Sequence, residues 1–197
     1  YEIVRQLGAG GMGVVYLAND PMMRREVAIK ILNYEDAQDG GIAGRCLQEA
    51  RTGAGLKHPN VVDVLDMGET DDGAFFLVLE FLTGAPFDER LARSALPPAD
   101  AIAVLLPVMD ALACAHDRGI VHRDLKPENV ILVPRKEGGD FVKVLDFGIA
   151  KILDAPSLTG SQQIFGTPGY IAPEYIQSTA IDGRADLYSL GVILYEM

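Results

Sequence analysis

The stretch from His122 to Asn129 reads His-Arg-Asp-Leu-Lys-Pro-Glu-Asn, and the rest of the chain is best interpreted outward from it. Downstream follow Asp146-Phe147-Gly148 and then Ala172-Pro173-Glu174. Upstream lie a glycine cluster, residues 8–13, and an isolated lysine, Lys30, at the end of an apolar run. Any one of these short motifs could occur by chance. Five sites in this order and spacing make a chance match negligible.

The segment Gly8–Val15 has the pattern G-x-G-x-x-G-x-V. Glycines allow positive φ angles and a close approach of the backbone to phosphates. A dinucleotide-binding turn has similar glycines but requires a helix next, whereas Val14–Leu17 continues as a strand. A lone lysine is usually a solvated surface charge, but the position of Lys30 behind a glycine loop favours a phosphate ligand. Glu49, on the following helical segment, is its natural counter-charge.

The pattern of apolar residues changes along the chain. Its first third predicts strands joined by tight turns. Residues 41–57 have helical content that Gly53 and other glycines weaken. Residues 98–118 predict a helix, because Ile102, Leu105, Leu106, Met109 and other apolar residues recur at helical spacing. Two short strands and a long polar loop follow, and then an apolar helix over about 185–197. The predicted strands are Tyr1–Leu7, Val14–Asn19, Glu26–Leu32, Val61–Met67, Ala74–Phe81, Val130–Val133 and Val142–Leu145.

Composition limits the classes of partner. Hydrophobic residues make up 49% of the chain and charged residues 23%, the balance of a folded globular protein. The formal net charge of -11 argues against binding to nucleic acid or anionic lipid. Cys46 and Cys114 stand far apart, which favours a reducing cytosol over a disulfide framework. The apolar run Ala101–Ala115 is interrupted and too short to span a bilayer, so we expect no membrane segment within this chain.

With these motifs the sequence resembles the serine/threonine kinases of the protein kinase superfamily. It is similar in particular to the eukaryotic-like signalling kinases of bacteria. The resemblance covers essentially the whole chain. It implies one α+β catalytic domain with the two-lobed protein kinase fold. Residues 1–82 would form an antiparallel β small lobe with the glycine loop. Residues 83–197 would form a mainly α large lobe with the catalytic loop and the activation segment.

The resemblance also implies which residues do the chemistry. Lys30 would contact the α- and β-phosphates of ATP while it pairs with Glu49. Asp124 would accept or orient the proton of the acceptor hydroxyl, and Lys126 would steady the γ-phosphoryl group. Asn129 and Asp146 would hold Mg²⁺ or Mn²⁺, in agreement with the oxygen ligands that Mg²⁺ prefers. The expected nucleotide-binding residues are Leu7, Gly8, Gly10, Gly13, Val15, Ala28, Lys30, Leu79, Glu80, Leu82 and Ile131.

Substrate class and regulation follow from the same resemblance. A lysine two residues after Asp124 is the serine/threonine pattern, and the Thr167 hydroxyl would bridge Asp124 and Lys126. His122 would pack beneath Phe147 rather than act as a base. Asp186 would anchor the backbone of His122 and Arg123. Phosphorylation of Thr159 or Ser161, by the kinase itself among others, would give Arg123 an anionic partner.

The resemblance implies that the large lobe is incomplete, since the helices that follow residues 185–197 in the family are absent, with the arginine that would pair with Glu174. We therefore expect the chain alone to be impaired, even where its parent is active. Two further alternatives stay open: a non-catalytic pseudokinase that binds partners, and a small-molecule phosphotransferase of related fold. The intact Lys30, Asp124, Asn129 and Asp146 argue against the first. Protein substrates and a cytoplasmic domain are expected, and the sequence leaves open a membrane anchor elsewhere in the parent.

Overall fold

The computed structural model describes residues 1–10, 13–32, 56–147, 167–177 and 181–197. Contacts divide the chain into two compact units: unit 1 contains residues 1–48 and 62–82, and unit 2 contains residues 49–61 and 83–197. Glu49, Thr159, Ser161 and nearly all of the helical segment expected over 41–57 lie outside the described residues.

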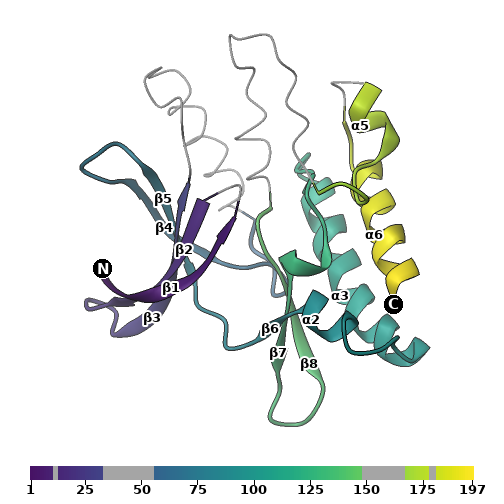
Figure 1. Ribbon diagram of the computed structural model, residues 1–197, viewed down its shortest axis with the longest axis horizontal. Helices are drawn as coiled ribbons and strands as arrows, with labels where there is room; N and C mark the ends of the chain where they lie inside the picture. The colour runs from purple at the N-terminus through teal and green to yellow at the C-terminus, as the bar shows by residue number, and fades with distance from the viewer. Residues whose placement is uncertain (11–12, 33–55, 148–166, 178–180) are drawn as a thin grey trace. The chain divides into compact units, whose positions relative to one another are not determined.

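Unit 1 is an antiparallel sheet of five strands in the order β1-β2-β3-β5-β4 (Figure 1). Each of its five predicted strands is confirmed, with ends that differ by a few residues. The strands are β1 Glu2–Gly10, β2 Gly13–Asp20, β3 Arg25–Leu32, β4 Val64–Glu69 and β5 Phe75–Glu80.

The core of this sheet is centred on β3. Val27 and Ile29 are buried there with Ala18 of β2 and Val78 of β5. Consecutive residues of β3 are buried, and since successive side chains of a strand point to opposite faces, this strand is covered on both faces. Lys30, on the same strand, is only 6% exposed. The strand β1 lies at the sheet edge, and all nine of its residues are exposed.

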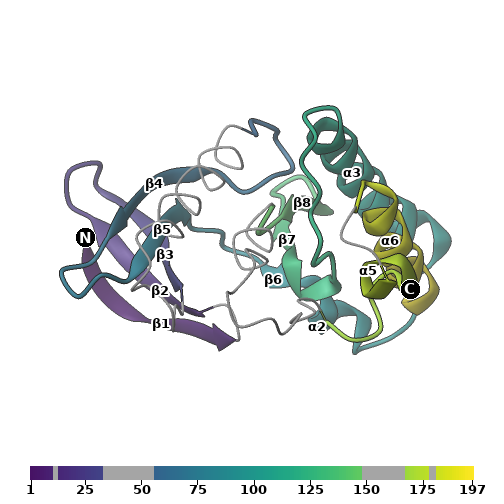
Figure 2. The ribbon, with the colours of Figure 1, turned by 90° about the horizontal axis from the view of Figure 1, so that it is seen from above.

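Unit 2 combines helices with a three-stranded sheet of order β6-β7-β8. The predicted helices and strands of this region are confirmed, and Figure 2 shows α6 beside α3, two helices that contact each other. The elements too short to give a periodic pattern were not predicted: β6, α2, η1 and α5. The bounds are β6 Ala85–Pro86, α2 Phe87–Leu91, α3 Pro98–His116, η1 Pro127–Asn129, β7 Val130–Pro134, β8 Asp140–Val144, α5 Pro173–Gln177 and α6 Arg184–Glu196.

One face of α3 forms much of the unit 2 core. The buried residues of this face are Ala101, Val104, Leu105, Val108, Ala111, Leu112 and Ala115, and most of them pack with Leu190 and Ile193 of α6 and with the strands β7 and β8. The whole helix α3, at 19 residues longer than the run Ala101–Ala115, has the length and the hydropathy that a membrane-spanning helix needs. These properties do not show a membrane span, because a helix in a protein core has them as well.

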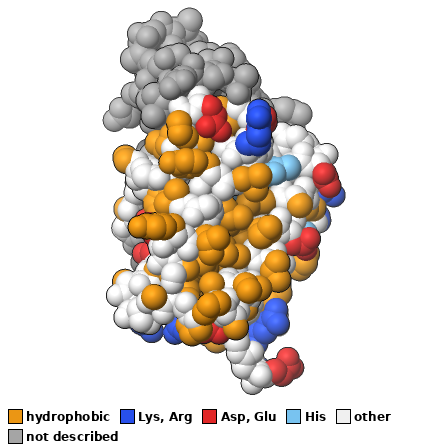
Figure 3. All heavy atoms as spheres, turned by 90° about the vertical axis from the view of Figure 1, so that its right-hand side faces the viewer, with side chains coloured by type: hydrophobic (Ala, Val, Ile, Leu, Met, Phe, Trp, Pro, Cys, Tyr) orange, Lys and Arg blue, Asp and Glu red, His pale blue; other side chains and the backbone are white. Residues whose placement is uncertain are grey.

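The opposite face of α3 is apolar and exposed. Ile102, Leu106 and Met109 have exposed fractions of 55%, 58% and 47%. Leu187 and Leu194 of α6 are exposed as well. Figure 3, which looks onto the side where α6 lies, shows hydrophobic side chains gathered over this part of unit 2.

Residues 56–61 belong to unit 2 although β4, which follows them, belongs to unit 1. The Val144 N–H donates to Asn60 O at 2.8 Å, and the Asn60 side-chain amide donates to Val142 O at 2.8 Å. Val61 forms a parallel bridge with Val144. The expected strand Val61–Met67 was therefore wrong at its start: β4 begins at Val64, because the preceding backbone is already bonded to β8.

Candidate active site

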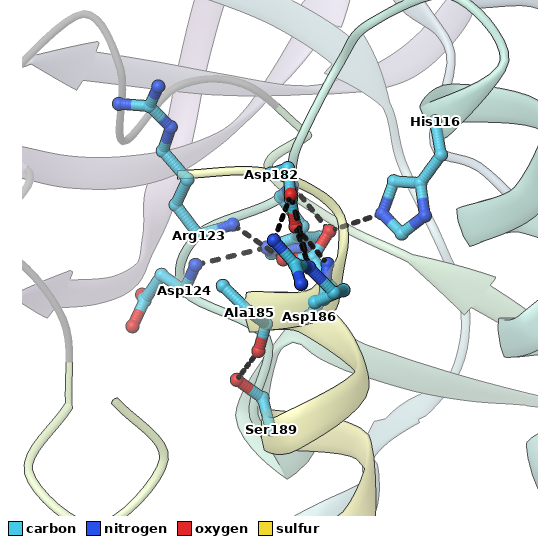
Figure 4. Close-up of polar contacts among 9 residues, drawn as sticks. His116, Arg123, Asp124, Asp182, Ala185, Asp186 and Ser189 are labelled. Atoms are coloured by element: carbon cyan, nitrogen blue, oxygen red, sulfur yellow. Dashed lines mark hydrogen bonds and ion pairs between the residues drawn. The ribbon is translucent and has the colours of Figure 1, made fainter. Parts of the chain in front are cut away.

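The loop that precedes β7 is anchored by one carboxylate of α6. Asp186 accepts the His122 N–H at Oδ2 and the Arg123 N–H at Oδ1, each at 2.9 Å (Figure 4). Asp186 is fully buried in the first turn of α6, where the helix dipole favours negative charge. Arg123 has φ +70°, a conformation that non-glycine residues rarely adopt and that surrounding contacts must hold. The anchoring role expected for Asp186 is confirmed.

His122 has both ring nitrogens engaged within the protein. Its Nε2 lies 2.7 Å from Leu145 O, and its Nδ1 accepts the Asp124 N–H at 3.3 Å. The neutral tautomer with hydrogen on Nε2 satisfies both partners. The ring meets Phe147 edge-on, with centroids 4.8 Å apart. His122 is fully buried and serves packing, as expected, which leaves no free nitrogen for a general base.

Asp124, Lys126 and Thr167 form a closed cluster. Lys126 Nζ lies 3.1 Å from Asp124 Oδ2 and donates to Thr167 Oγ1 at 2.6 Å. The Thr167 hydroxyl in turn donates to Asp124 Oδ1 at 3.2 Å. Thr167 thus bridges Asp124 and Lys126, as expected. Both oxygens of a nearly buried carboxylate are held by a cation and a hydroxyl, so the carboxylate is fixed in orientation.

Asn129 and Asp146 are brought toward each other by the backbone. The Leu145 N–H donates to Asn129 O at 2.8 Å, and Asp146 follows directly with φ +60°. Asn129 Nδ2 donates to Asp124 O at 2.7 Å, so the side-chain oxygen is the atom of this amide that could face a metal ion. Among the described residues, no group of three or more His, Cys, Asp or Glu side chains could hold a metal. One amide and one carboxylate fit Mg²⁺, which takes its remaining ligands from water and phosphate.

The sheet of unit 1 aligns several of the expected nucleotide-binding residues in one row. Gly8 pairs with Val15 across β1 and β2, and Val15 pairs with Lys30 across β2 and β3. Lys30 pairs in turn with Leu77 of β5. Residues far apart in the sequence are thus neighbours, with the lysine in the middle of the sheet.

The glycines where β1 ends and β2 begins differ in whether the structure would tolerate a side chain in their place. Gly13 has φ +140°, and a Cβ atom there would overlap the carbonyl oxygen of Ile31, so no other residue fits. Cβ atoms at Gly8 and Gly10 would meet no atom of the described residues within 4 Å. Packing against the described part of the chain therefore does not require these two glycines.

Comparison with known proteins decides the family. A family model described as protein kinase domain matches residues 1–197. The chain belongs to the protein kinase family. Membership of this family implies the general use of ATP and a divalent metal ion.

Individual relatives of this kinase domain are bacterial. The serine/threonine-protein kinase Pkn1 of Myxococcus xanthus is 45% identical over 198 residues, which cover 100% of this chain and 28% of the relative. The serine/threonine-protein kinase PrkC of Bacillus subtilis is 37% identical, over 100% of this chain and 30% of the relative. The chain thus spans about a third of the curated relatives' length. A crystal structure of the Mycobacterium tuberculosis PknI kinase domain has a TM-score of 0.76 and 33% identity, over 98% of this chain and 70% of that one.

The remaining expected nucleotide-binding residues of the kinase domain are distributed over both units. In unit 1, Ala28 is buried and pairs with Leu79, and Leu7 is exposed at the sheet edge. Glu80 accepts the Asp63 N–H at Oε1 at 2.8 Å and donates its own N–H to Asp63 O at 3.0 Å. The Glu80 N–H is therefore already engaged within unit 1. Leu82 ends unit 1, and Ile131 lies on β7 of unit 2.

Sequence reasoning missed further contacts of α6 with the site. Ser189 Oγ donates to Tyr170 O at 2.8 Å, and the Tyr170 hydroxyl donates to the carboxylate of Glu196. Burial and this hydrogen bond raise the pKa of Tyr170. The side chain of His116, at the end of α3, lies 2.7 Å from that of Asp186, across 70 residues of sequence. The partners in such pairs lie so far apart in the chain that no local pattern of a single sequence indicates their contact.

Proposed function

We propose that this kinase domain transfers the terminal phosphoryl group of ATP to serine and threonine hydroxyls of protein substrates, itself included. The cluster of Asp124, Lys126 and Thr167 carries this proposal. A lysine beside the carboxylate, bridged by a threonine hydroxyl, is the arrangement that the serine/threonine resemblance implies.

In this proposal the cluster acts on the acceptor. Each carboxylate oxygen has two lone pairs, so Asp124 can accept a substrate hydroxyl while it keeps its contacts with Thr167 and Lys126. The substrate oxygen is thereby aimed at the phosphorus atom. The ammonium group of Lys126 stabilises charge that develops on the transferred group. Positioning and charge stabilisation dominate this reaction, so a strong base is not needed.

The other expected residues would hold the nucleotide. Asn129 and Asp146 would give oxygen ligands to Mg²⁺ or Mn²⁺, an ion that neutralises phosphate charge when bound. The hairpin of Gly8, Gly10 and Gly13 would lie over the phosphates, and Lys30, paired with Glu49, would contact them. The adenine ring would pack against apolar side chains and meet the backbone of Glu80 and Leu82. Those apolar residues are Leu7, Val15, Ala28, Leu79 and Ile131.

Regulation by phosphorylation is part of the proposal. Phosphate on Thr159 or Ser161 would place negative charge near Arg123 and order the activation segment. Phosphopeptide mass spectrometry of the active enzyme identifies these sites, and full activity of an unmodified enzyme would exclude this mode of activation. We propose that the domain works in the cytoplasm, with any anchor supplied by another region of the protein.

The decisive experiment is the variant Asp124→Asn. Transfer of labelled phosphate from ATP to serine and threonine peptides should fall about 10²–10⁴-fold, because the acceptor hydroxyl loses its orienting carboxylate. ATP affinity should be unchanged, since Asp124 is assigned to the acceptor. The matched control is Asp110→Asn, which alters an exposed carboxylate on α3.

Two results would contradict the proposal. Transfer by Asp124→Asn at the rate of the unaltered chain would remove Asp124 from the reaction. Transfer to small-molecule alcohols with none to peptides would instead favour a small-molecule phosphotransferase.

A further inference from the structure

The segment that leads into β6 lies directly against β7. Gly84 precedes β6, and the two residues of β6 pair with Leu132 and Ile131 of β7 (Figure 1). A Cβ atom at Gly84 would lie 2.5 Å from Leu132 O and 2.8 Å from Ile131 Cγ2. The Gly84 backbone is therefore so close to β7 that no side chain fits between the two.

Space, rather than backbone conformation, accounts for this glycine. Glycines that are needed for their conformation have positive φ, as Gly13 and Gly119 do, and Gly84 is not among them. Two of the three atoms nearest to a Cβ atom at this position belong to the backbone of Leu132. A flexible side chain could turn away from such a contact, whereas a backbone that is paired in a sheet cannot.

Gly84 approaches the face of β7 that bears Ile131. Val130 and Leu132 are 1% and 8% exposed and belong to the unit 2 core. Ile131 lies between them and is half-buried, because successive side chains of a strand point to opposite faces. The Ile131 side chain therefore points away from this core, and its Cγ2 atom lies next to Gly84.

We propose that Gly84 is a positioning residue for ATP: because it has no side chain, β6 can lie against β7, and the Ile131 side chain is held where the adenine ring is proposed to pack. This inference rests on the kinase function proposed above and adds a determinant of its nucleotide affinity. Gly84 acts through Ile131 and is assigned no contact with the phosphates or the acceptor hydroxyl.

The segment is not free to move away from β7 as a whole. Phe87, three residues after Gly84, is fully buried in the unit 2 core, where it begins α2. Non-bonded atoms pack at about 3.5–4.0 Å, so a methyl group at position 84 requires a displacement of about 1 Å. Because Phe87 fixes the end of the segment, this displacement falls on the pairing of β6 with β7 and on the Ile131 side chain.

A displaced Ile131 should weaken binding of the base without slowing the chemistry. The adenine ring takes no part in phosphoryl transfer, so its contacts are the same in the bound complex and in the transition state. Loss of such uniform binding raises KM and leaves kcat unchanged. A single methylene group in an apolar pocket is worth about 10–200-fold in discrimination, and we expect an effect at the lower end of this range.

The experiment compares the unaltered chain with Gly84→Ala. The KM for ATP should rise about tenfold, and kcat should stay within about twofold. Adenosine, which has the base but no phosphate, should lose the same factor in affinity when it is titrated and followed by NMR. The δ1 methyl signal of Ile131 should shift on addition of adenosine to the unaltered chain, and it should shift less in the variant.

Gly68 supplies a matched control within unit 1. A Cβ atom there would lie 2.7 Å from Phe76 Cζ, so this position on β4 is crowded as well. Neither Gly68 nor Phe76 is assigned to the nucleotide. Gly68→Ala should lower the urea midpoint at unchanged KM for ATP. A rise in KM equal to that of Gly84→Ala would mean that general loosening of the fold is responsible, and it would overturn the inference.

A double-mutant cycle decides whether Gly84 acts through Ile131. Ile131→Ala removes the side chain without crowding β7, and alone it should raise the KM for ATP about tenfold. Addition of Gly84→Ala to Ile131→Ala should then raise KM no further, because coupled positions are not additive. Where Gly84→Ala melts below the assay temperature, Ile131→Ala decides by itself, and an unchanged KM there overturns the inference.

Three further results would overturn it: an unchanged KM in Gly84→Ala, a rise in KM that adds in full to that of Ile131→Ala, or a fall in kcat in place of the rise in KM. Absence of phosphate transfer by the unaltered chain would instead defeat the proposed function. The adenosine titration would then still decide whether Gly84 sets the affinity for the base.

Discussion

The glycine hairpin of unit 1, described at residues 8–10 and 13–15, and the catalytic loop of unit 2, residues 122–129, are both assigned to phosphate chemistry, yet they are held in opposite ways. Every residue of β1 is exposed, and Cβ atoms at Gly8 and Gly10 would meet no atom in the part of the chain that the structure describes. In the catalytic loop His122 and Asp124 are buried, and polar contacts reach the loop from α6, from the end of β8 and from Thr167.

This difference separates two ways of serving a ligand. The hairpin contributes backbone and open space, so its glycines at 8 and 10 can change without disturbing the rest of unit 1. The loop contributes side chains whose directions matter, and these are fixed by buried polar groups whose loss destabilises the fold. Stability and activity should therefore be separable in the hairpin and coupled in the loop.

The largest effect is expected at the centre of the loop's support, in the variant Asp186→Ala. Its loss leaves the N–H groups of His122 and Arg123 without their acceptor and leaves His116 without its anion. Removing one partner of a buried pair costs about 3–5 kcal/mol. This is a large part of the roughly 5–15 kcal/mol that stabilises a typical domain. Urea denaturation and phosphate transfer should both report the loss.

The control for this variant is Asp110→Ala, which removes an exposed carboxylate paired with His58. Exposed ion pairs contribute about 0–1 kcal/mol, so the urea midpoint should barely move. Equal destabilisation by the two variants would show that burial of the carboxylate is not what holds the loop.

An intermediate effect is expected within the hairpin, where Gly13→Ala is compared with Gly10→Ala. Gly13→Ala forces a side chain onto Ile31 O at φ +140°, and residues in such conformations cost about 1–3 kcal/mol each. The new methyl group of Gly10→Ala meets no atom of the described residues, so it should leave the free energy of unfolding unchanged. It should still weaken ATP binding, because the new methyl group occupies the space proposed for phosphate. Urea denaturation and nucleotide titration separate the two effects.

If Gly10→Ala destabilised unit 1 as much as Gly13→Ala, the hairpin would be packed rather than open, and the comparison would fail. Unchanged ATP affinity in Gly10→Ala would remove the nucleotide from this face of the hairpin.

The parts of the site that sequence predicted are those encoded locally or by motif. The cluster of Asp124, Lys126 and Thr167 and the anchoring by Asp186 follow from the family pattern, and the structure contains the corresponding hydrogen bonds. The strands were predictable because runs of β-branched residues lie between turn residues.

The face of α3 was not predictable in the same way. Ile102, Leu106 and Met109 contributed to the helical pattern yet are exposed, whereas Ala111 and Ala115 are fully buried. Burial here depends on how closely α6 and the strands approach, and small residues allow that approach. The exposed Ile, Leu and Met side chains are more hydrophobic than the buried alanines, so hydrophobicity alone indicates the wrong face. The apolar pattern therefore predicted the helix but not which of its sides is buried.

Contacts across long stretches of sequence could not be predicted at all. His116 and Asp186 are 70 positions apart, and residues 56–61 join unit 2 through hydrogen bonds to β8. Neither depends on local propensity or periodicity. Both depend on which side chains and backbone groups the tertiary fold brings together.

The smallest effect is expected four residues before Asp186, at Asp182, and it tests whether burial rather than the number of hydrogen bonds sets the stabilisation. Asp182 accepts hydrogen bonds from the guanidinium group and then from the backbone N–H of Arg184, and in that order of importance these lower the pKa of Asp182 from 3.8 to about 2. Its contribution is therefore present above 3.8 and is lost as pH falls through about 2. Both side chains are exposed, at 59% and 83%, so water screens the pair. In Arg184→Ala the pKa of the Asp182 carboxyl group, followed by NMR, should rise toward 3.8. It should stay below 3.8, because the backbone N–H of residue 184 still donates a hydrogen bond to this carboxylate. The melting temperature at neutral pH should not change. A fall in melting temperature as large as that of Asp186→Ala would contradict this prediction. The exposed carboxylate of Asp182 would then stabilise the fold as strongly as the buried carboxylate of Asp186, and burial would not set the size of the effect.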